Sequence, residues 1–142
     1  MGESELLVPP TLTDVAQATQ RVRGLLPDWL SDGERDAIEL ALAEALTNIV
    51  QHGFSNDPGE PVRLRVRERG GALEVDLWDQ GRPIPSARLA QADPSTTFQF
   101  DPTNLAGLPE GGMGLALIKS AFHEVRYGSR DGTNRLHLVR RL

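Results

Sequence analysis

The stretch VRLRVRERGGALEVDLWD, residues 62–79, decides the fold, because apolar and polar residues alternate on both sides of a glycine pair. Such alternation is typical of strands with one buried face, and Gly70-Gly71 predicts a two-residue hairpin turn. The turn sets three cross-strand pairs on the polar face: Arg67 with Glu74, Arg65 with Asp76, and Arg63 with Trp78. Two ion pairs and a cation–π contact, each contributing about 0.2–1 kcal/mol, should line that face. The aliphatic face must be covered by helices.

Two helices are predicted on the N-terminal side of this hairpin, after a short strand at residues 4–8. Each helix begins with a Ser or Thr followed three residues later by an acid, which is the capping-box pattern. The first follows Thr11 and ends before Pro27, with apolar residues at helical spacing. The second follows Ser31 and extends over about residues 32–51.

On the C-terminal side, the periodicity disappears over about residues 83–111, where prolines interrupt the chain. An irregular segment of this length is usually a functional lid or a disordered loop. A helix and two strands complete the chain, at 115–122, about 124–128 and 134–140, with a turn at Gly128–Gly132. This order predicts a two-layer α/β sandwich (α+β), in which a mostly antiparallel mixed sheet is covered on one face by helices. We expect residues 1–142 to form a single domain.

The composition is that of an ordinary globular domain and excludes several classes of site. Of the 142 residues, 39% are hydrophobic and 25% are charged, and the net charge is −5. A negative net charge argues against nucleic acid or an anionic membrane as the main ligand. The absence of cysteine excludes a disulfide framework and a thiolate metal site. With no export signal and no window near the roughly 18 apolar residues of a membrane span, we expect a cytoplasmic protein.

The second predicted helix has two polar residues one turn apart, Glu44 and Asn48, on a stripe with Ala37 and Ala41. This stripe lies beside the core stripe, and its alanines leave room above the helix. A carboxylate and an amide stacked at i and i+4 suit a general base and a ligand of Mg²⁺, which takes few protein ligands. The alternative is that both are solvated polar residues on an amphipathic helix.

Asp79 shares the parity of Val75 and Leu77, so it should lie on the helix-covered side at the end of its strand. A buried carboxylate is costly unless it is hydrogen-bonded. An acceptor in this position, with Gly81 beside it to admit a flat ring, suits the exocyclic amine of adenine. The alternative is that Asp79 caps the turn that follows it.

The run Gly111-Gly112-Met113-Gly114 stands where the last predicted helix begins. Unpaired backbone N–H groups and the helix dipole attract anions at such a place, and glycines let phosphates approach closely. Two better-known phosphate motifs do not fit, because they would require glycine where Leu117 or Ile118 stands. A glycine-rich helix start is a weak signal by itself.

Taken in order, the three signals resemble the motifs of the gyrase/histidine-kinase ATPase superfamily: Glu44-x-x-x-Asn48 on a helix, Asp79-x-Gly81 at a strand end, and Gly112-x-Gly114 after a lid. More closely, ALAEALTNIVQHGF, DLWDQGRPI and GGMGLALIKSAFHEVRY are similar to the anti-sigma-factor serine kinases of the RsbW and SpoIIAB type. The resemblance covers about residues 31–140 and implies a Bergerat-type ATP-binding fold with a lid.

The resemblance also implies a role for each matching residue. Glu44 would be the general base, Asn48 would ligate Mg²⁺ that bridges the phosphates, and Asp79 would accept a hydrogen bond from the adenine amine. The other nucleotide-binding positions would be Gly81, Ile84, Gly112, Met113, Gly114, Leu115 and Thr133.

Two features depart from the family. Relatives can have a basic residue just before the second glycine box, where this chain has Pro109-Glu110. Transfer would then be slow or would need a residue from elsewhere, such as Lys119 or Arg88. The family also places a threonine near the adenine at the start of the last strand, and Thr133 is the candidate. Strand parity places Asn134 on the inner face instead, unless a bulge reconciles the two.

The implied function is that of a serine/threonine protein kinase and anti-sigma factor. Such a kinase would use Mg·ATP to phosphorylate a STAS-type antagonist protein, and partner switching with a sigma factor would regulate transcription. The resemblance further implies a homodimer, with no direct nucleic-acid or membrane ligand. The alternatives are a non-catalytic ATP-dependent protein-binding module, which Glu110 favours, and ATP hydrolysis coupled to motion.

Overall fold

Five antiparallel strands form one sheet in the computed structural model of the protein, which describes residues 2–53, 60–82 and 118–141. The strands are β1 (Glu3–Val8), β2 (Val62–Arg69), β3 (Ala72–Asp79), β4 (Glu124–Arg130) and β5 (Thr133–Arg141). Their order across the sheet is β1-β2-β3-β5-β4, and every neighbouring pair is antiparallel. The expected mixed sheet is therefore wholly antiparallel within the described residues.

The hairpin of β2 and β3 forms with the register that its glycine pair predicts. Gly70 and Gly71 have φ of 57° and 76°, values that favour glycine. The three predicted pairs are present: Arg67–Glu74 at 3.0 Å, Arg65–Asp76 at 2.9 Å, and Arg63 over the Trp78 ring at 4.1 Å from its centre. The predicted hairpin is confirmed.

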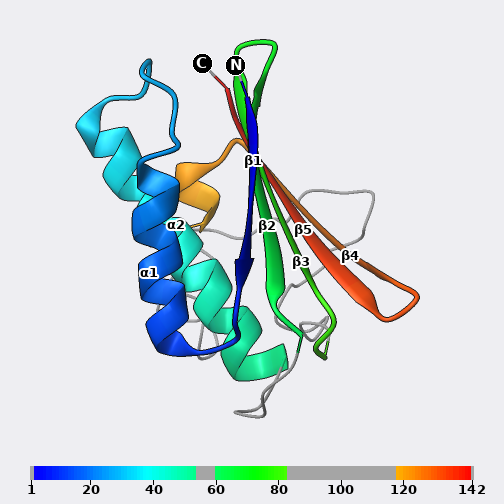
Figure 1. The fold of residues 1–142 in the computed structure, drawn as a ribbon. Coiled ribbons are helices and arrows are strands. Elements are labelled where there is room, and N and C mark those ends of the chain that lie inside the picture. Colours follow the sequence, from blue (N-terminus) through cyan, green and yellow to red (C-terminus); the bar gives the residue numbers. More distant parts are fainter. Residues whose placement is uncertain (1, 54–59, 83–117, 142) are drawn as a thin grey trace, which may run out of the picture.

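Two helices, α1 (Leu12–Arg23) and α2 (Asp32–Asn48), pack on one face of the sheet (Figure 1). Both begin at the predicted caps, Thr11 and Ser31, whose side chains accept hydrogen bonds from the backbone N–H three residues later. α2 continues in a π-helical turn, η1 (Ile49–Gly53), so the second helical segment reaches as far as expected. None of the helices described is long and apolar enough to cross a membrane.

The core lies between the two helices and the sheet. The inward-facing side chains of the hairpin are buried, as their alternation predicts: Val62, Leu64, Val66, Leu73, Val75 and Leu77. Ile38, Leu42 and Leu46 of α2 belong to the same cluster and have no exposed surface. Burying each such side chain stabilises the fold by about 1.5–3 kcal/mol, more than one exposed ion pair contributes. This apolar layer holds the end of β3 in a defined position beneath α2.

The face of the sheet opposite the helices has a fully buried carboxylate, Asp76. Arg65 and Arg135 donate to it at 2.9 and 2.7 Å, and Nδ1 of His137 lies 2.7 Å from Oδ1. Burial raises the pKa of the Asp76 carboxyl, but hydrogen bonds from these basic neighbours outweigh burial and hold that pKa well below its usual range. Asp76 is therefore a charged structural residue that joins β2, β3 and β5.

We expect Asp76→Asn to lower the free energy of unfolding at pH 7 by about 3 kcal/mol, because it leaves two arginines without their anion. A folded pKa below the unfolded one means that the carboxylate stabilises the fold above about pH 4, and that this contribution is lost as the pH falls through the folded pKa. The deficit measured by urea denaturation should therefore shrink at pH 3. Glu74→Gln, on the same strand, is the control and should cost about 1 kcal/mol or less. Equal losses at pH 7 would contradict the role given to Asp76.

Candidate functional site

The candidate site is built around Asp79, the last residue of β3. Its side chain lies on the helix-covered side, as parity predicts, and is only 5% exposed. The backbone N–H of Gly81 donates to Asp79 Oδ1 at 2.9 Å, and Nδ2 of Asn134 donates to the same oxygen at 2.9 Å. Asp79 therefore caps the turn that follows it and is at the same time an inward-facing carboxylate.

The electrostatic setting of Asp79 differs from that of Asp76. Burial raises the pKa of the Asp79 carboxyl, and the hydrogen bonds from Asn134 and Gly81 oppose this rise without reversing it. Its donors among the described residues are one side-chain amide and one backbone N–H, whereas those of Asp76 are basic side chains. A buried carboxylate held by neutral donors reduces stability, and such groups cluster at functional sites.

Asn134, and not Thr133, is the residue of β5 whose side chain lies on the inner face beside Asp79. The β3–β5 register continues to Asp79 opposite Asn134, so no bulge turns Thr133 inward. Asn134 is 2% exposed, and its Nδ2 also donates to the backbone oxygen of Gly81 at 2.9 Å. The hydroxyl of Ser129 donates to Asn134 Oδ1 at 2.6 Å and orients the amide. Asn134 therefore lies on the inner face, as strand parity predicts, and Thr133 lines a hollow on the opposite face.

Both bonds that the described residues make to Asp79 end on Oδ1. Within the part of the chain that the structure describes, Oδ2 is the oxygen of this carboxylate that remains to accept a further hydrogen bond. The amide of Asn134 cannot turn its acceptor toward Asp79 without losing its bonds to Ser129 and Gly81. The relay from Ser129 through Asn134 therefore holds the carboxylate in one orientation.

Glu44 and Asn48 lie one turn apart near the C-terminal end of α2. Asn48 is buried at 7% exposure, Glu44 is partly exposed, and Ala41 beside them is fully buried. Figure 1 shows this end of α2 at the same end of the sheet as the end of β3. Asn48 is also the last residue before the π-helical turn, a feature frequent at functional sites. The structure therefore brings Asn48 and Asp79 to one end and one face of the sheet.

The remaining predicted positions lie outside the described residues. These are the lid at 83–111, with Arg88 and Glu110, and the nucleotide-binding positions Ile84, Gly112, Met113, Gly114 and Leu115. The helix predicted to follow the glycine turn is described from Ile118, which is buried together with Ala121. Lys119, between them, is partly exposed.

The donor set of the described site fits one particular kind of metal binding. No group of three His, Cys, Asp or Glu side chains that could hold a metal occurs in the ranges 2–53, 60–82 and 118–141. A single amide oxygen, that of Asn48, suits Mg²⁺, which commonly completes its octahedral shell with water and with phosphate oxygens of the nucleotide. The residues present therefore fit a magnesium ion that arrives with its phosphates.

Sequence reasoning missed the cluster on the opposite face, where Asp76, Arg135 and His137 meet. The parity of β3 and β5 places each of these side chains outward, but the pairing of β3 with β5 joins residues about 60 positions apart. The relay from Ser129 to Asn134 was also missed. Its signal is the same parity, applied across the turn between β4 and β5.

A helix-covered antiparallel sheet, with an inward aspartate at the end of β3 and an acid–amide pair on the covering helix, defines the α+β sandwich fold of histidine-kinase-like ATPases. The chain belongs to the histidine kinase-like ATPase domain family, whose model matches residues 8–140. Solved structures agree on the fold. The RsbU and RsbW domains of Rv1364c from Mycobacterium tuberculosis align over 100% of this chain and 33% of theirs, with a TM-score of 0.67 and 16% identity. The catalytic domain of the histidine kinase ThkA aligns over 99% and 96%, with a TM-score of 0.53 and 14% identity.

Curated relatives place the chain among RsbW-type kinases within this family. Serine/threonine-protein kinase BtrW of Bordetella bronchiseptica is 33% identical over 119 residues, which are 80% of this chain and 75% of BtrW. Serine-protein kinase RsbW of Bacillus subtilis is 30% identical over 100 residues, and the match spans 70% of this chain and 60% of RsbW. The anti-sigma F factor of Anoxybacillus flavithermus is 28% identical over 111 residues, 77% of this chain and 70% of that protein. The resemblance read from the motifs is confirmed.

Proposed function

We propose that this protein is a serine/threonine kinase that uses Mg·ATP to phosphorylate a STAS-type antagonist protein, and that it is also an anti-sigma factor. The observation that carries the proposal is Asp79, a buried carboxylate held by neutral donors at the same end of the sheet as Asn48. The names of the relatives support the class of reaction, since BtrW and RsbW are named protein kinases.

Each described residue has a separate task in this proposal. Asp79 accepts a hydrogen bond from the adenine amine, and Asn134 holds its carboxylate in place. Asn48 holds Mg²⁺, which when bound neutralises the charge of the phosphates. Glu44, one turn before Asn48, takes the proton of the substrate hydroxyl. The glycine turn at 112–114 and Leu115, outside the described residues, would offer backbone N–H groups to the phosphates.

The oxygen of a serine or threonine hydroxyl forms a bond to the γ-phosphorus of ATP. The bond between that phosphorus and the β–γ bridging oxygen breaks, and ADP leaves with the electron pair. The proton of the hydroxyl passes to the carboxylate of Glu44, and the products are ADP and a phosphorylated protein.

Transfer from γ-³²P-labelled ATP to purified STAS-domain proteins tests the proposal directly. We expect label on a serine or threonine of a STAS-domain protein encoded beside this gene, with magnesium present and not with EDTA. Binding of Mg·ATP without label on any of these proteins would overturn the kinase assignment. Co-purification with a sigma factor, released when the unphosphorylated antagonist is added, tests the anti-sigma part. Size-exclusion chromatography with light scattering tests the proposed homodimer.

A second candidate function is a non-catalytic module that binds a partner protein only when ATP is bound. Glu110 favours it, because an acid stands where relatives can have a basic residue near the terminal phosphate. In this case ATP and its non-hydrolysable analogue should promote partner binding equally, with no labelled product. The labelling experiment therefore separates the two candidates.

We expect Asn48→Ala to remove the contribution of magnesium to ATP binding. Wild-type protein should bind ATP about tenfold more tightly with Mg²⁺ than with EDTA, and the variant should lose this difference. Isothermal titration calorimetry in both buffers measures the ratio. Thr47→Ala, at the preceding residue of α2, is the control and should keep the wild-type ratio. A variant at position 48 with an unchanged ratio would show that magnesium is held elsewhere.

A further inference from the structure

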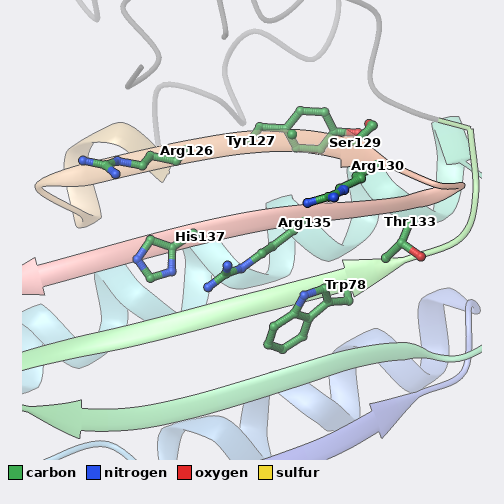
Figure 2. A pocket seen from close by; sticks show the side chains of 9 residues that line it. Trp78, Arg126, Tyr127, Ser129, Arg130, Thr133, Arg135 and His137 are labelled. Carbon is green, nitrogen blue, oxygen red and sulfur yellow. The ribbon is translucent and has the colours of Figure 1, made fainter. Parts of the chain in front are cut away.

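The face of the sheet opposite α1 and α2 has a hollow of about 630 Å³ at the end where β3, β4 and β5 meet. Four basic side chains and Trp78 line it together with Tyr127, Ser129 and Thr133, and we refer to it as the basic hollow after its basic members: Arg126, Arg130, Arg135 and His137. Figure 2 shows Arg126 and Arg130 on β4, with Arg135 and His137 on the neighbouring β5 and Trp78 beside them. Trp78 lies outward and Asp79 inward, and the hollow approaches the Asp79 site only at Ser129, whose hydroxyl donates to Asn134.

Trp78 organises the cationic groups around it. The guanidinium carbon of Arg63 lies 4.1 Å from the centre of its ring, and those of Arg65 and Arg135 lie at 5.0 and 5.4 Å. Arg135 also donates to the buried Asp76, yet its side chain remains 47% exposed. Its guanidinium is therefore fixed on one side and open on the other, so little rotamer entropy would be lost when it binds an anion.

Acids balance only part of the positive charge of the hollow, because Asp76 pairs with Arg135 and His137 and leaves the arginines of β4 to one exposed acid. Arg126 is exposed, and Arg130 is 94% exposed with an equally exposed neighbour, Asp131, at 3.8 Å. The glutamates of β1, Glu3 and Glu5, lie at the far edge of the same face, because β1 and β4 are the two outer strands. This local excess of positive charge stands in a chain whose net charge is −5. A cluster of exposed arginines is the group best suited to bidentate recognition of carboxylates.

We propose that the basic hollow binds an acidic segment of a partner protein. A short peptide fits the size of the charged area better than nucleic acid does. A nucleic-acid backbone that continued along β4 would meet Glu124 and Asp131 at its two ends, and one that crossed the sheet would meet Glu5. The inference goes beyond the proposed kinase activity, because the hollow lies on the face opposite Asp79 and its occupation requires no nucleotide.

Trp78 provides the signal for a direct test. The chain has two tryptophans, so Trp29→Phe leaves Trp78 as the only one. Circular dichroism first checks that this variant is folded. Titration with hexaglutamate should then give a saturable change in Trp78 emission, and the binding should weaken with added salt. Hexalysine should give none. Arg126→Glu and Arg130→Glu should each raise the dissociation constant about fivefold or more. Arg21→Glu, an equal change of charge at an exposed position of α1, should leave it unchanged.

Three results would overturn the proposal. Equal weakening by Arg21→Glu would show attraction to overall charge and no site at the hollow. Tighter binding of a single-stranded oligonucleotide of equal charge, lost in Arg126→Glu, would make the face a nucleic-acid interface. Light scattering could also show that the protein mass falls to that of a monomer in Arg126→Glu. This result would make the hollow an interface between two copies of this chain. Binding of Mg·ATP should be the same in all these variants, so failure here leaves the kinase proposal unaffected.

Discussion

Replacement of Asp79 by asparagine should weaken ATP binding strongly and leave the fold intact. The asparagine oxygen can still accept from Gly81 and Asn134, which bond to Oδ1 of the native carboxylate. Its amide nitrogen would stand in place of Oδ2, so a donor would face the donor of the adenine amine. We expect affinity for Mg·ATP to fall about a hundredfold, the order expected when a charged hydrogen bond is lost and two donors oppose each other.

The same variant should be as stable as wild type at pH 7, or more stable. Burial raises the pKa of the Asp79 carboxyl above that of the unfolded chain, so the ionised side chain reduces stability at neutral pH. This cost is relieved as the pH falls through the raised folded pKa, and asparagine removes it at every pH. The stability advantage of Asp79→Asn should therefore be largest at neutral pH and should shrink in acid. Protonation of Asp79 in wild type should weaken ATP binding over the same range.

Calorimetry with Mg·ATP and thermal denaturation between pH 4 and 8 measure the two effects. Asp76→Asn is the matched control, since it lies on the same strand but on the opposite face. It should unfold more easily and bind ATP with wild-type affinity once folded. Wild-type affinity in Asp79→Asn would show that the carboxylate does not contact the base. A large loss of stability would show that Asp79 is structural.

Local pattern determined most of the fold, because the decisive elements are close in sequence. The alternation in residues 62–79 and the Gly70-Gly71 turn predicted a register that the structure has. The same parity predicted correctly that Asp79 faces inward, and the caps at Thr11 and Ser31 predicted where the helices begin. Each of these inferences depends on residues within one element or one turn, where backbone geometry leaves few alternatives.

The last hairpin shows where local reading was incomplete. We expected strands at about 124–128 and 134–140 with a turn at Gly128–Gly132, but β4 and β5 extend to Arg130 and Thr133. Asp131 and Gly132 form the turn, with φ of 54° and 81°, which is the Asp-Gly hairpin signal. The longer strands place Asn134 opposite Asp79, so parity correctly predicted which of Thr133 and Asn134 faces inward.

The pairing of strands that are distant in the chain could not be predicted from local sequence patterns. Asp76 meets Arg135 and His137 only because β5 lies between β3 and β4, although β3 and β5 are far apart in the chain. Periodicity says which face a side chain takes but does not say which strand lies beside it. For this reason the inward aspartate was predicted, whereas the basic hollow on the other face was not.

Replacement of Glu44 by glutamine should stop phosphoryl transfer while ATP still binds. Glutamine has the same shape but cannot take the proton of the substrate hydroxyl, and positioned general bases contribute about 10²–10⁴-fold to rate. We expect labelling of the STAS-type substrate to fall by that factor. Affinity for Mg·ATP should stay within about threefold, because the variant keeps Asp79, proposed to bind the adenine ring, and Asn48, proposed to bind the magnesium ion.

The matched control is Glu39→Gln, a carboxylate on the same helix that pairs with Arg23 at 3.2 Å. It should label its substrate at the wild-type rate, which separates proton transfer from a general loss of charge on α2. The two variants then separate the two functions of the site. Glu44→Gln should bind ATP without phosphoryl transfer, whereas Asp79→Asn should be strongly impaired in both. If Glu44→Gln labels as fast as wild type, the hydroxyl proton leaves by another route, because a carboxamide cannot accept it. In that case α2 would bind the nucleotide through Asn48 without supplying the general base.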